Sequence, residues 1–360
     1  MQKRLTSLDA FRGFTVAAMI MVNFPGNSDF VFFTLRHSIW NALSFTDQVA
    51  PFFLFIIGVS IHFAYSNKSS QEKPSLYKKI ILRALKIFAI GMFLNLMPTF
   101  DLSEIRWTGT LHRIAIVFLI CSTIALHTNW KQQLIILTTL LLAYWFIMTS
   151  IPYPGEGKVM LEPGKNIAAY IDSLYLPGTM WQKTWDPEGI LSIVPTCCTT
   201  LIGMLTGKIM KSELPENLRL NYLMIIGVGM SILGYFVGLS FPVNENIWSS
   251  SFVLVTGGFA CLIFASMYFI FDVLPYSKYS KIGVVFGVNA ITAYVLGDLL
   301  GLVFYGIKIG GNSINMHFFN YFNQLGVLPE LISLIYALLF VSIVSIPCWI
   351  LYKKRIFIKV

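Results

Sequence analysis

The chain has 360 residues, of which 56% are hydrophobic and 12% are charged, and its formal net charge is +9. Because soluble domains carry about 25% charged residues, this composition excludes an ordinary water-soluble protein and indicates an integral membrane protein, with a mean hydropathy of +0.70. The positive charge does not indicate nucleic-acid binding, because the basic residues lie in short clusters between apolar runs. Such clusters are typical of topology signals beside anionic lipid.

Apolar segments long enough to cross a bilayer, for which about 20 residues suffice, occur along the whole chain. We expect ten transmembrane helices near residues 8–25, 49–66, 80–98, 110–128, 133–151, 189–208, 221–240, 250–272, 283–306 and 330–352. Polar groups interrupt the first and the ninth. Since no soluble domain or internal repeat is evident, the sequence predicts an all-α polytopic protein with one transmembrane domain over residues 1–360.

Lysine and arginine residues are unevenly distributed between the connecting segments. Most lie near the two chain ends and in the connections that follow the even-numbered helices. Positive residues favour the cytoplasmic side, so we expect both termini to be cytoplasmic (N-in, C-in). The long segments 26–48, 152–188 and 307–329 are then structured outer loops.

The first of these loops carries an unusual set of polar side chains. His37, Trp40, Asn41 and Asp47 lie within a short stretch between two apolar runs. A lone histidine in such a loop is more often incidental than catalytic, but a catalytic base needs an orienting group and a binding pocket, which these neighbours could supply. The other histidines lack the ligand spacing of a zinc site, and we expect no metal.

The first predicted helix contains two polar residues, Arg12 and Asn23, which are eleven residues apart. This spacing is close to three helical turns, so both lie on one face, about 16 Å apart along the axis. Asn23 either caps the helix before Pro25 or presents its amide to a cavity that holds a polar ligand.

Several cations lie in or beside predicted helices. Arg83 and Lys86 are three residues apart and share one side of a helix, and Lys208 closes the sixth helix. These three either reach toward lipid headgroups or form a phosphate site on the cytoplasmic face. Arg106 and Arg113 are seven residues apart and project from one side. Arg113 lies within an apolar run and therefore needs a partner.

Further polar and aromatic residues gather at the outer ends of predicted helices. Asp186 and Glu188 open the sixth helix, where negative charge stabilises the helix N-terminus, so capping is a sufficient explanation for them. The remaining candidates for a binding site are Trp185, Asn244, Asn246 and Trp248 in outer segments, and Asn289, which interrupts the ninth predicted helix.

Taken together, these strings resemble the heparan-α-glucosaminide N-acetyltransferase family and its bacterial relatives. The matching strings are LDAFRGF (8–14), MVN (21–23), HSIWN (37–41), GTLHRI (109–114), DPEGIL (186–191), GKI (207–209) and NENIWS (244–249). Each is moderately specific, and they occur in the expected order along the chain.

The resemblance implies a helical bundle that takes acetyl-CoA from the cytoplasm and acetylates an amino sugar of the glucosamine type on the far side of the membrane. In that family the histidine of the His-x-x-Trp-Asn string and the asparagine that ends the first helix are the catalytic pair, which correspond to His37 and Asn23. His37 would act as general base, Asn23 would stabilise the thioester oxyanion, and Asp47 would orient the imidazole.

If the chain has this activity, the other candidates fall into two groups. Acetyl-CoA would be held by Arg12, Arg83, Lys86, Arg113 and Lys208. The amino sugar would be held by Trp40, Asn41, Arg106, Trp185, Asp186, Glu188, Asn244, Asn246, Trp248 and Asn289. The expected setting is the bacterial inner membrane, in contact with lipid, with a homodimer implied by the family alone.

Two other functions remain open. The opening string also resembles membrane O-acyltransferases of bacterial surface glycans, which carry a histidine where this chain has Asn23. A small-solute or sugar transporter would show broken helices in two matched halves, for which the first and ninth predicted helices are weak candidates. The chain also departs from the family pattern, with His112 where the family often has glutamine and Ala42 where it often has glycine. The identity of the acceptor stays open.

Overall fold

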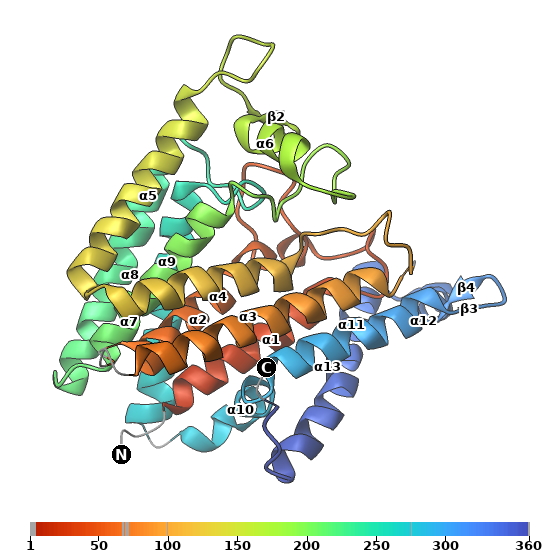
Figure 1. The fold of residues 1–360 in the computed structure, drawn as a ribbon. Coiled ribbons are helices and arrows are strands. Elements are labelled where there is room, and N and C mark those ends of the chain that lie inside the picture. Colours follow the sequence, from red (N-terminus) through yellow and green to blue (C-terminus); the bar gives the residue numbers. More distant parts are fainter. Residues whose placement is uncertain (1–4, 67, 69–71, 99, 275, 359–360) are drawn as a thin grey trace. The chain divides into compact units, whose positions relative to one another are not determined.

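The structure is a computed structural model that describes residues 5–66, 68, 72–98, 100–274 and 276–358. It is an all-α polytopic membrane protein, in which the described strands form only two short hairpins (Figure 1). The chain divides into two compact units. The first unit comprises residues 1–38, 44–53 and 266–360, and the second comprises residues 39–43 and 54–265. The expectation of a single domain stays a prediction.

Within the described residues, seven helical segments are long and apolar enough to cross a membrane. They are Thr46–Tyr65, which contains α2 (Val49–Tyr65), α4 (Thr110–His127), α5 (Trp130–Ser150), α7 (Ile193–Met210), α8 (Glu216–Gly238), Ser250–Val273, which contains α9 (Ser250–Tyr268), and α13 (Pro329–Lys353). A further pair, Ser277–Gly287 and Ala290–Gly306, bends by 62° and would count as an eighth span if it crosses as one unit.

Two of the ten predicted spans are helices whose composition is less apolar than a span requires. The helix α1 (Thr6–Asn23) carries Asp9 and Arg12, and α3 (Lys73–Leu96) carries five lysines and arginines. Each of the ten predicted segments therefore coincides with helical structure, while seven or eight of them have the length and composition of a membrane span. The charges of α1 and α3 explain the difference, because each charge makes insertion into lipid costly.

In the first unit, α1 packs against α10 (Lys281–Gly287), α11 (Ala290–Gly306) and α13. Glycines allow the backbones of α1 and α10 to touch, since a Cβ atom on Gly13 would lie 1.7 Å from the carbonyl oxygen of Gly283. Close approach of this kind is typical of helices that associate within a membrane.

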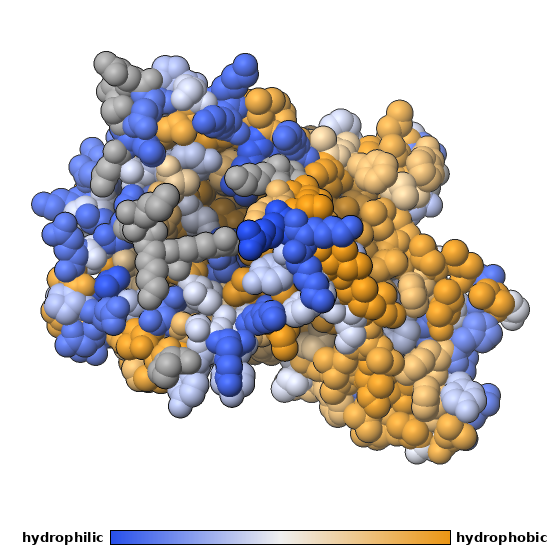
Figure 2. All heavy atoms as spheres, turned by 90° about the horizontal axis from the view of Figure 1, so that it is seen from below, coloured by the Kyte–Doolittle hydropathy of each residue, from blue (hydrophilic) through white to orange (hydrophobic). Residues whose placement is uncertain are grey.

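In the second unit, α7 is the central helix, and α4, α5 and α8 pack against it. About 72% of α7 is buried, compared with 28% and 22% of the apolar 18-residue stretches of α5 and α8. The outward faces of these two helices are apolar, and Ile225 and Phe236 are 69% and 66% exposed. Figure 2 shows broad hydrophobic areas at the surface of one face of the molecule. Soluble monomers rarely expose such areas, so we assign them to lipid contact.

The long connecting segments have defined structure of their own. The segment between α5 and α7 forms the hairpin β1 (Leu161–Glu162) and β2 (Lys165–Asn166), followed by α6 (Ile167–Tyr175). The hairpin β3 (Lys308–Ile309) and β4 (Asn312–Ser313) precedes α12 (Ile314–Gln324), and η1 (Phe33–Leu35) lies in the segment after α1. The prediction that these loops are structured is confirmed, and their location on the outer side stays a prediction.

Candidate functional site

The first unit holds His37 against a buried carboxylate. The Nδ1 atom of His37 lies 3.0 Å from Oδ1 of Asp47, which belongs to η2 (Thr46–Gln48). The side chain of Asp47 is fully buried, whereas 57% of the His37 side chain is exposed. The same carboxylate accepts hydrogen bonds from the backbone amides of Ser38 and Ser44, at 3.2 and 2.8 Å. Asp47 therefore orients the imidazole and folds the loop that carries it.

Asn23 is the last residue of α1, and it is exposed. The helix end is closed by a backbone hydrogen bond, in which the amide of Phe24 donates to the carbonyl oxygen of Ile20 at 3.2 Å. Among the described residues, the Asn23 side chain makes no hydrogen bond, so capping through its side chain does not account for it. Asn23 and His37 lie in the same unit, although none of the hydrogen bonds within the described chain joins them.

The other two predicted site residues of the first unit are held by protein groups. Arg12 donates through Nη1 to Asp9 at 3.2 Å and to the carbonyl oxygen of Gly287 at 3.4 Å. Asn289 is 1% exposed, donates through Nδ2 to the carbonyl oxygen of Ile356 at 3.1 Å, and accepts a second hydrogen bond from the same C-terminal segment. Arg12 thus ties α1 to α10, and Asn289 ties the break between α10 and α11 to the chain end.

The second unit contains an ion-pair network around Arg106. Its Nε and Nη2 atoms donate to the two carboxylate oxygens of Asp186 at 2.7 and 2.5 Å, and Nη2 also donates to Glu188 at 2.5 Å. Thr108 donates to Asp186 at 2.7 Å, and the Arg106 guanidinium lies 5.1 Å from the centre of the Trp181 ring. A two-pronged arginine–carboxylate contact of this kind is both strong and directional.

The charges in this network are set by burial and by the partners. Burial alone would raise the pKa of Asp186, but the hydrogen bonds and charge of Arg106 lower that pKa to about 2. Burial also opposes the charge of Arg106, yet its acidic partners hold its pKa above the ordinary value. Asp172 of α6 behaves differently, because burial raises its pKa to about 6. The ion pair is therefore charged at neutral pH, and Asp172 takes up a proton in mildly acidic solution.

Asp186→Asn is expected to destabilise the protein by about 3 kcal/mol at neutral pH, the lower end of the range for a broken buried ion pair, because Glu188 stays beside Arg106. The folded-state pKa of Asp186 is depressed, so its contribution is fully present above the ordinary carboxyl pKa of 3.8 and is lost as the pH falls toward about 2. Melting temperatures of wild type and variant should therefore differ at pH 7 and converge in acid. The exposed Asp101→Asn is the matched control, and an equal melting temperature of Asp186→Asn and wild type at pH 7 would contradict this prediction.

Arg113 is buried and has its own partners. It donates through Nη2 to the carbonyl oxygen of Pro187 and, at 2.8 Å, to the hydroxyl of Ser192. Its guanidinium lies 4.6 Å from the centre of the Trp248 ring, which is 1% exposed and donates through Nε1 to Thr199 at 3.1 Å. The ring of Trp248, which was predicted to hold the sugar, therefore packs against Arg113 inside the second unit.

The remaining predicted sugar contacts lie in the second unit. The rings of Trp40 and Trp185 meet edge to face with centres 5.3 Å apart, and Trp40 donates through Nε1 to the carbonyl oxygen at the start of β1 at 2.9 Å. Asn41 accepts a hydrogen bond from the buried Asn244 at 3.0 Å, and Asn246 lies half-buried in the same turn as Asn244. The structure thus brings the first-loop residues 40 and 41 together with two predicted outer segments.

Three of the five cations predicted to hold acetyl-CoA are exposed and lie in the second unit. These are Arg83 and Lys86 of α3 and Lys208 of α7. The Arg83 guanidinium lies 4.9 Å from the centre of the Phe118 ring on α4. Exposed cations of this kind suit a phosphate group, whereas Arg12 and Arg113 already have protein partners.

Sequence reasoning missed four residues that complete these clusters, namely Thr108, Asp172, Trp181 and Ser192. Thr108 lies between Arg106 and Arg113 and directly precedes the string at residues 109–114, and its hydroxyl was a usable signal. The others meet partners that are distant in the sequence or depend on loop geometry, which residue spacing does not reveal.

Comparisons with known proteins agree with the resemblance of the sequence strings. A family model described as "Heparan-alpha-glucosaminide N-acetyltransferase, catalytic" matches residues 4–237. The chain is 27% identical to the heparan-alpha-glucosaminide N-acetyltransferase of Mus musculus over 365 residues, which cover 82% of this chain and 54% of that protein. It is also 27% identical to the Homo sapiens protein of the same name over 357 residues, which cover 81% and 52% of the two chains. The chain therefore spans about half the length of the curated relatives it matches.

Proposed function

We propose that this chain, which belongs to the heparan-alpha-glucosaminide N-acetyltransferase family, transfers the acetyl group of acetyl-CoA to the amine of a glucosamine-type sugar. The observation that carries the proposal is the exposed imidazole of His37, which a buried carboxylate holds through Nδ1. An imidazole oriented in this way is the usual arrangement of a general base. Both residues lie within the part of the chain that the family model matches.

In the proposed reaction, the sugar amine attacks the carbonyl carbon of the acetyl thioester. A carbon–nitrogen bond forms, the carbon–sulfur bond breaks, and the CoA thiolate leaves. Asp47 on Nδ1 favours the tautomer with its proton there, which makes Nε2 the basic nitrogen of His37. Nε2 takes the proton that the amine loses and passes it to the departing thiolate. The amide of Asn23 donates to the carbonyl oxygen as negative charge develops on it.

Two routes lead to the same products, an acetylated amine and free CoA. In direct transfer, the amine attacks the thioester itself. In the second route, His37 takes the acetyl group first and passes it to the amine. Incubation of the purified protein with labelled acetyl-CoA and no acceptor distinguishes them, because label bound to His37 supports the second route and its absence in a rapidly quenched sample supports the first.

We assign the phosphates of acetyl-CoA to Arg83, Lys86 and Lys208, whose charges are exposed. Arg12 supports the contact of α1 with α10 in the first unit, and Arg113 supports the fold of the second unit. The acceptor sugar is assigned to Trp40, Trp185, Asn41 and Asn246, with the network of Arg106, Asp186 and Glu188 as a rigid, charged support and Asn244 as the anchor of Asn41. The proposed setting is a bacterial inner membrane, with both termini cytoplasmic and the acceptor on the outer side.

Asp47→Asn is expected to remove much of the roughly 10²–10⁴-fold rate gain that a general base supplies. An asparagine has one acceptor oxygen in place of two and no charge, so it orients His37 poorly. The expected pattern is a lower kcat with an unchanged KM for acetyl-CoA, and a shifted pH–rate profile. Ser44→Ala is the matched control, because it removes only the hydroxyl oxygen that accepts a hydrogen bond from the Asp47 backbone amide at 3.2 Å. An equal loss in both variants would indicate a role in loop folding alone.

Purified protein incubated with acetyl-CoA and glucosamine tests the proposed function. We expect free CoA and N-acetylglucosamine, identified by nuclear magnetic resonance of the product. An O-acetylated sugar would favour the surface-glycan O-acyltransferases. No product, together with uptake of the sugar by proteoliposomes, would favour a transporter and overturn the proposal.

A further inference from the structure

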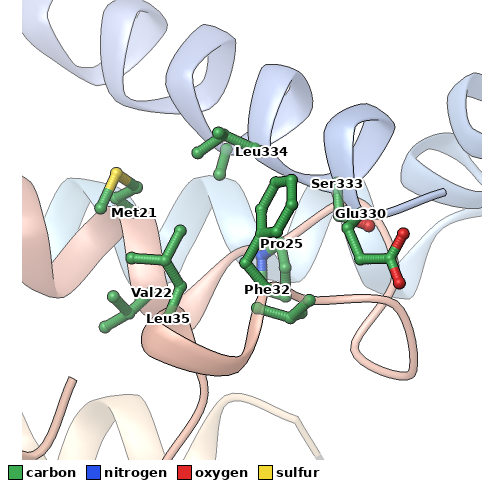
Figure 3. A pocket seen from close by; sticks show the side chains of 10 residues that line it. Met21, Val22, Pro25, Phe32, Leu35, Glu330, Ser333 and Leu334 are labelled. Atoms are coloured by element: carbon green, nitrogen blue, oxygen red, sulfur yellow. The ribbon is translucent and has the colours of Figure 1, made fainter. Parts of the chain in front are cut away.

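The two ends of α13 present different surfaces within the first unit. Its first turns, with Leu334, line a depression beside the end of α1 (Figure 3), whose free volume of about 10 Å³ holds about one water molecule. Its last turns, together with the start of α10, carry an aromatic and basic surface. The second end of α13 is therefore the better candidate for a ligand site.

Two ammonium groups meet one tryptophan ring at this end. The Nζ atom of Lys281, the first residue of α10, lies 4.9 Å from the centre of the Trp349 ring. The Nζ atom of Lys353, the last residue of α13, lies 5.5 Å from the same centre. Both lysines are exposed, and the indole is half-buried. Trp349 therefore gathers two cations from different helices at one point of the surface.

Further cations lie close to this pair in the sequence. Lys278, Lys354 and Arg355 are also exposed. Across the described part of the chain, none of these five cations forms an ion pair with a carboxylate. Asp272, which precedes α10, accepts hydrogen bonds from two backbone amides at the start of α1 instead. A group of cations without acidic partners attracts an anion to this end of the unit.

An exposed apolar stripe on α13 leads to the basic end. Its members recur every three or four residues, so they share one face of the helix. They are Leu339, Ile343, Ile346 and Ile350, which are between 38% and 58% exposed. Lys353 follows Ile350 by three residues and continues the same face. A molecule with an anionic head and apolar chains matches this sequence of apolar and basic groups.

We propose that this end of α13 binds an anionic phospholipid. The lipid phosphate accepts hydrogen bonds from the ammonium groups of Lys281 and Lys353, its glycerol region lies against Trp349, and an acyl chain follows the apolar stripe. Tryptophan favours the membrane–water interface, and basic sites between transmembrane helices bind anionic headgroups. The inference goes beyond the proposed function and does not rest on it, because no residue assigned to the reaction takes part.

The chemistry of the surface favours a lipid over two other occupants. A free phosphate would leave the apolar stripe without a partner. A second copy of the chain, docked through the same surface about a two-fold axis, would bring two groups of cations together. The predicted cytoplasmic location of the C-terminus agrees with a lipid, since anionic lipids are typical of the cytoplasmic leaflet.

The test measures the binding of single lipid molecules to the detergent-purified protein by native mass spectrometry, with phosphatidylglycerol and phosphatidylcholine as probes. The double variant Lys281→Gln/Lys353→Gln should raise the Kd of phosphatidylglycerol by about 25-fold, from about fivefold for each lysine beside an anionic headgroup. Each single variant should raise this Kd by about fivefold, and the Kd of phosphatidylcholine should stay unchanged. The melting temperature of all three variants in phosphatidylcholine nanodiscs should equal that of the wild type, because both side chains are exposed.

Lys131→Gln is the matched control. Lys131 is also an exposed lysine beside a tryptophan at a helix end, with its Nζ atom 5.8 Å from the centre of the Trp130 ring. Among the described residues, no second ammonium group lies over that ring. This variant should leave the Kd of phosphatidylglycerol within about twofold of the wild type.

Inorganic phosphate as a competitor separates a lipid site from a site for a soluble anion. It should not displace phosphatidylglycerol, and displacement would assign the cations to a soluble anion and overturn the inference. Equal Kd values for the two lipids in the wild type would also contradict it. So would an equal loss of phosphatidylglycerol binding in Lys131→Gln and in the double variant, because general surface charge would then explain the binding.

Discussion

His37→Ala is expected to lower kcat for acetyl transfer by about 10²–10⁴-fold, the usual contribution of a general acid–base group. Its imidazole is mostly exposed, so its removal leaves no cavity in the core, and the melting temperature should stay close to that of the wild type. The KM for acetyl-CoA should also change little, because the assigned phosphate contacts lie elsewhere. Initial rates at saturating acetyl-CoA and glucosamine measure the effect.

The matched control for this variant is His317→Ala. His317 is also an exposed histidine of the first unit, and its Nε2 atom lies 2.6 Å from the carbonyl oxygen of Ile309. Its removal should loosen the hairpin before α12 and leave kcat within about twofold, since no general-base contribution is lost. Near-normal transfer by correctly folded His37→Ala would show that the base has been assigned to the wrong residue.

Asn23→Ala is expected to lower kcat by about 10²–10³-fold, as the loss of one oxyanion donor does in other acyl transfers. The side chain makes no hydrogen bond within the described residues, and backbone groups close the helix end. The substitution should therefore leave the melting temperature unchanged. Separate measurements of kcat and thermal stability distinguish a donor to the transition state from a residue that holds the helix.

Asn323→Ala on α12 is the control for Asn23→Ala, because it removes an exposed amide from the same unit. It should not change kcat. If Asn23→Ala lowers the melting temperature and the activity together, Asn23 acts as a helix cap, the alternative role that the sequence allowed. An unchanged kcat would remove Asn23 from the proposed mechanism.

The membrane helices were predictable because runs of about 20 apolar residues have few other uses. The sequence located helical structure at all ten predicted positions, including α1 and α3, whose charges separate them from the most apolar spans. It did not predict α6 and α12, which have nine and eleven residues and lie within polar loops. Helices this short are decided by tertiary packing, which an apolar-length criterion does not capture.

Within the candidate site, local and distant contacts were not equally predictable. His37 and Asp47 are ten residues apart, and a loop of that length readily brings a base and a carboxylate together. Arg106 and Asp186 are separated by 80 residues, and their pairing depends on how the segments before α4 and α7 pack. The burial of Trp248 could not be predicted from the sequence either. A tryptophan in a short turn is expected to be exposed, and its burial depends on Arg113, which is distant in the sequence.

The most direct test of acetyl transfer across the membrane uses sealed proteoliposomes that contain the protein. Labelled acetyl-CoA is supplied on one side of the membrane and glucosamine on the other, for the wild type and for His37→Ala. We expect labelled N-acetylglucosamine on the glucosamine side for the wild type, and a rate at least about 10²-fold lower for the variant. Equal product from both proteins, or no acetylated sugar from the wild type, would contradict the proposed transfer.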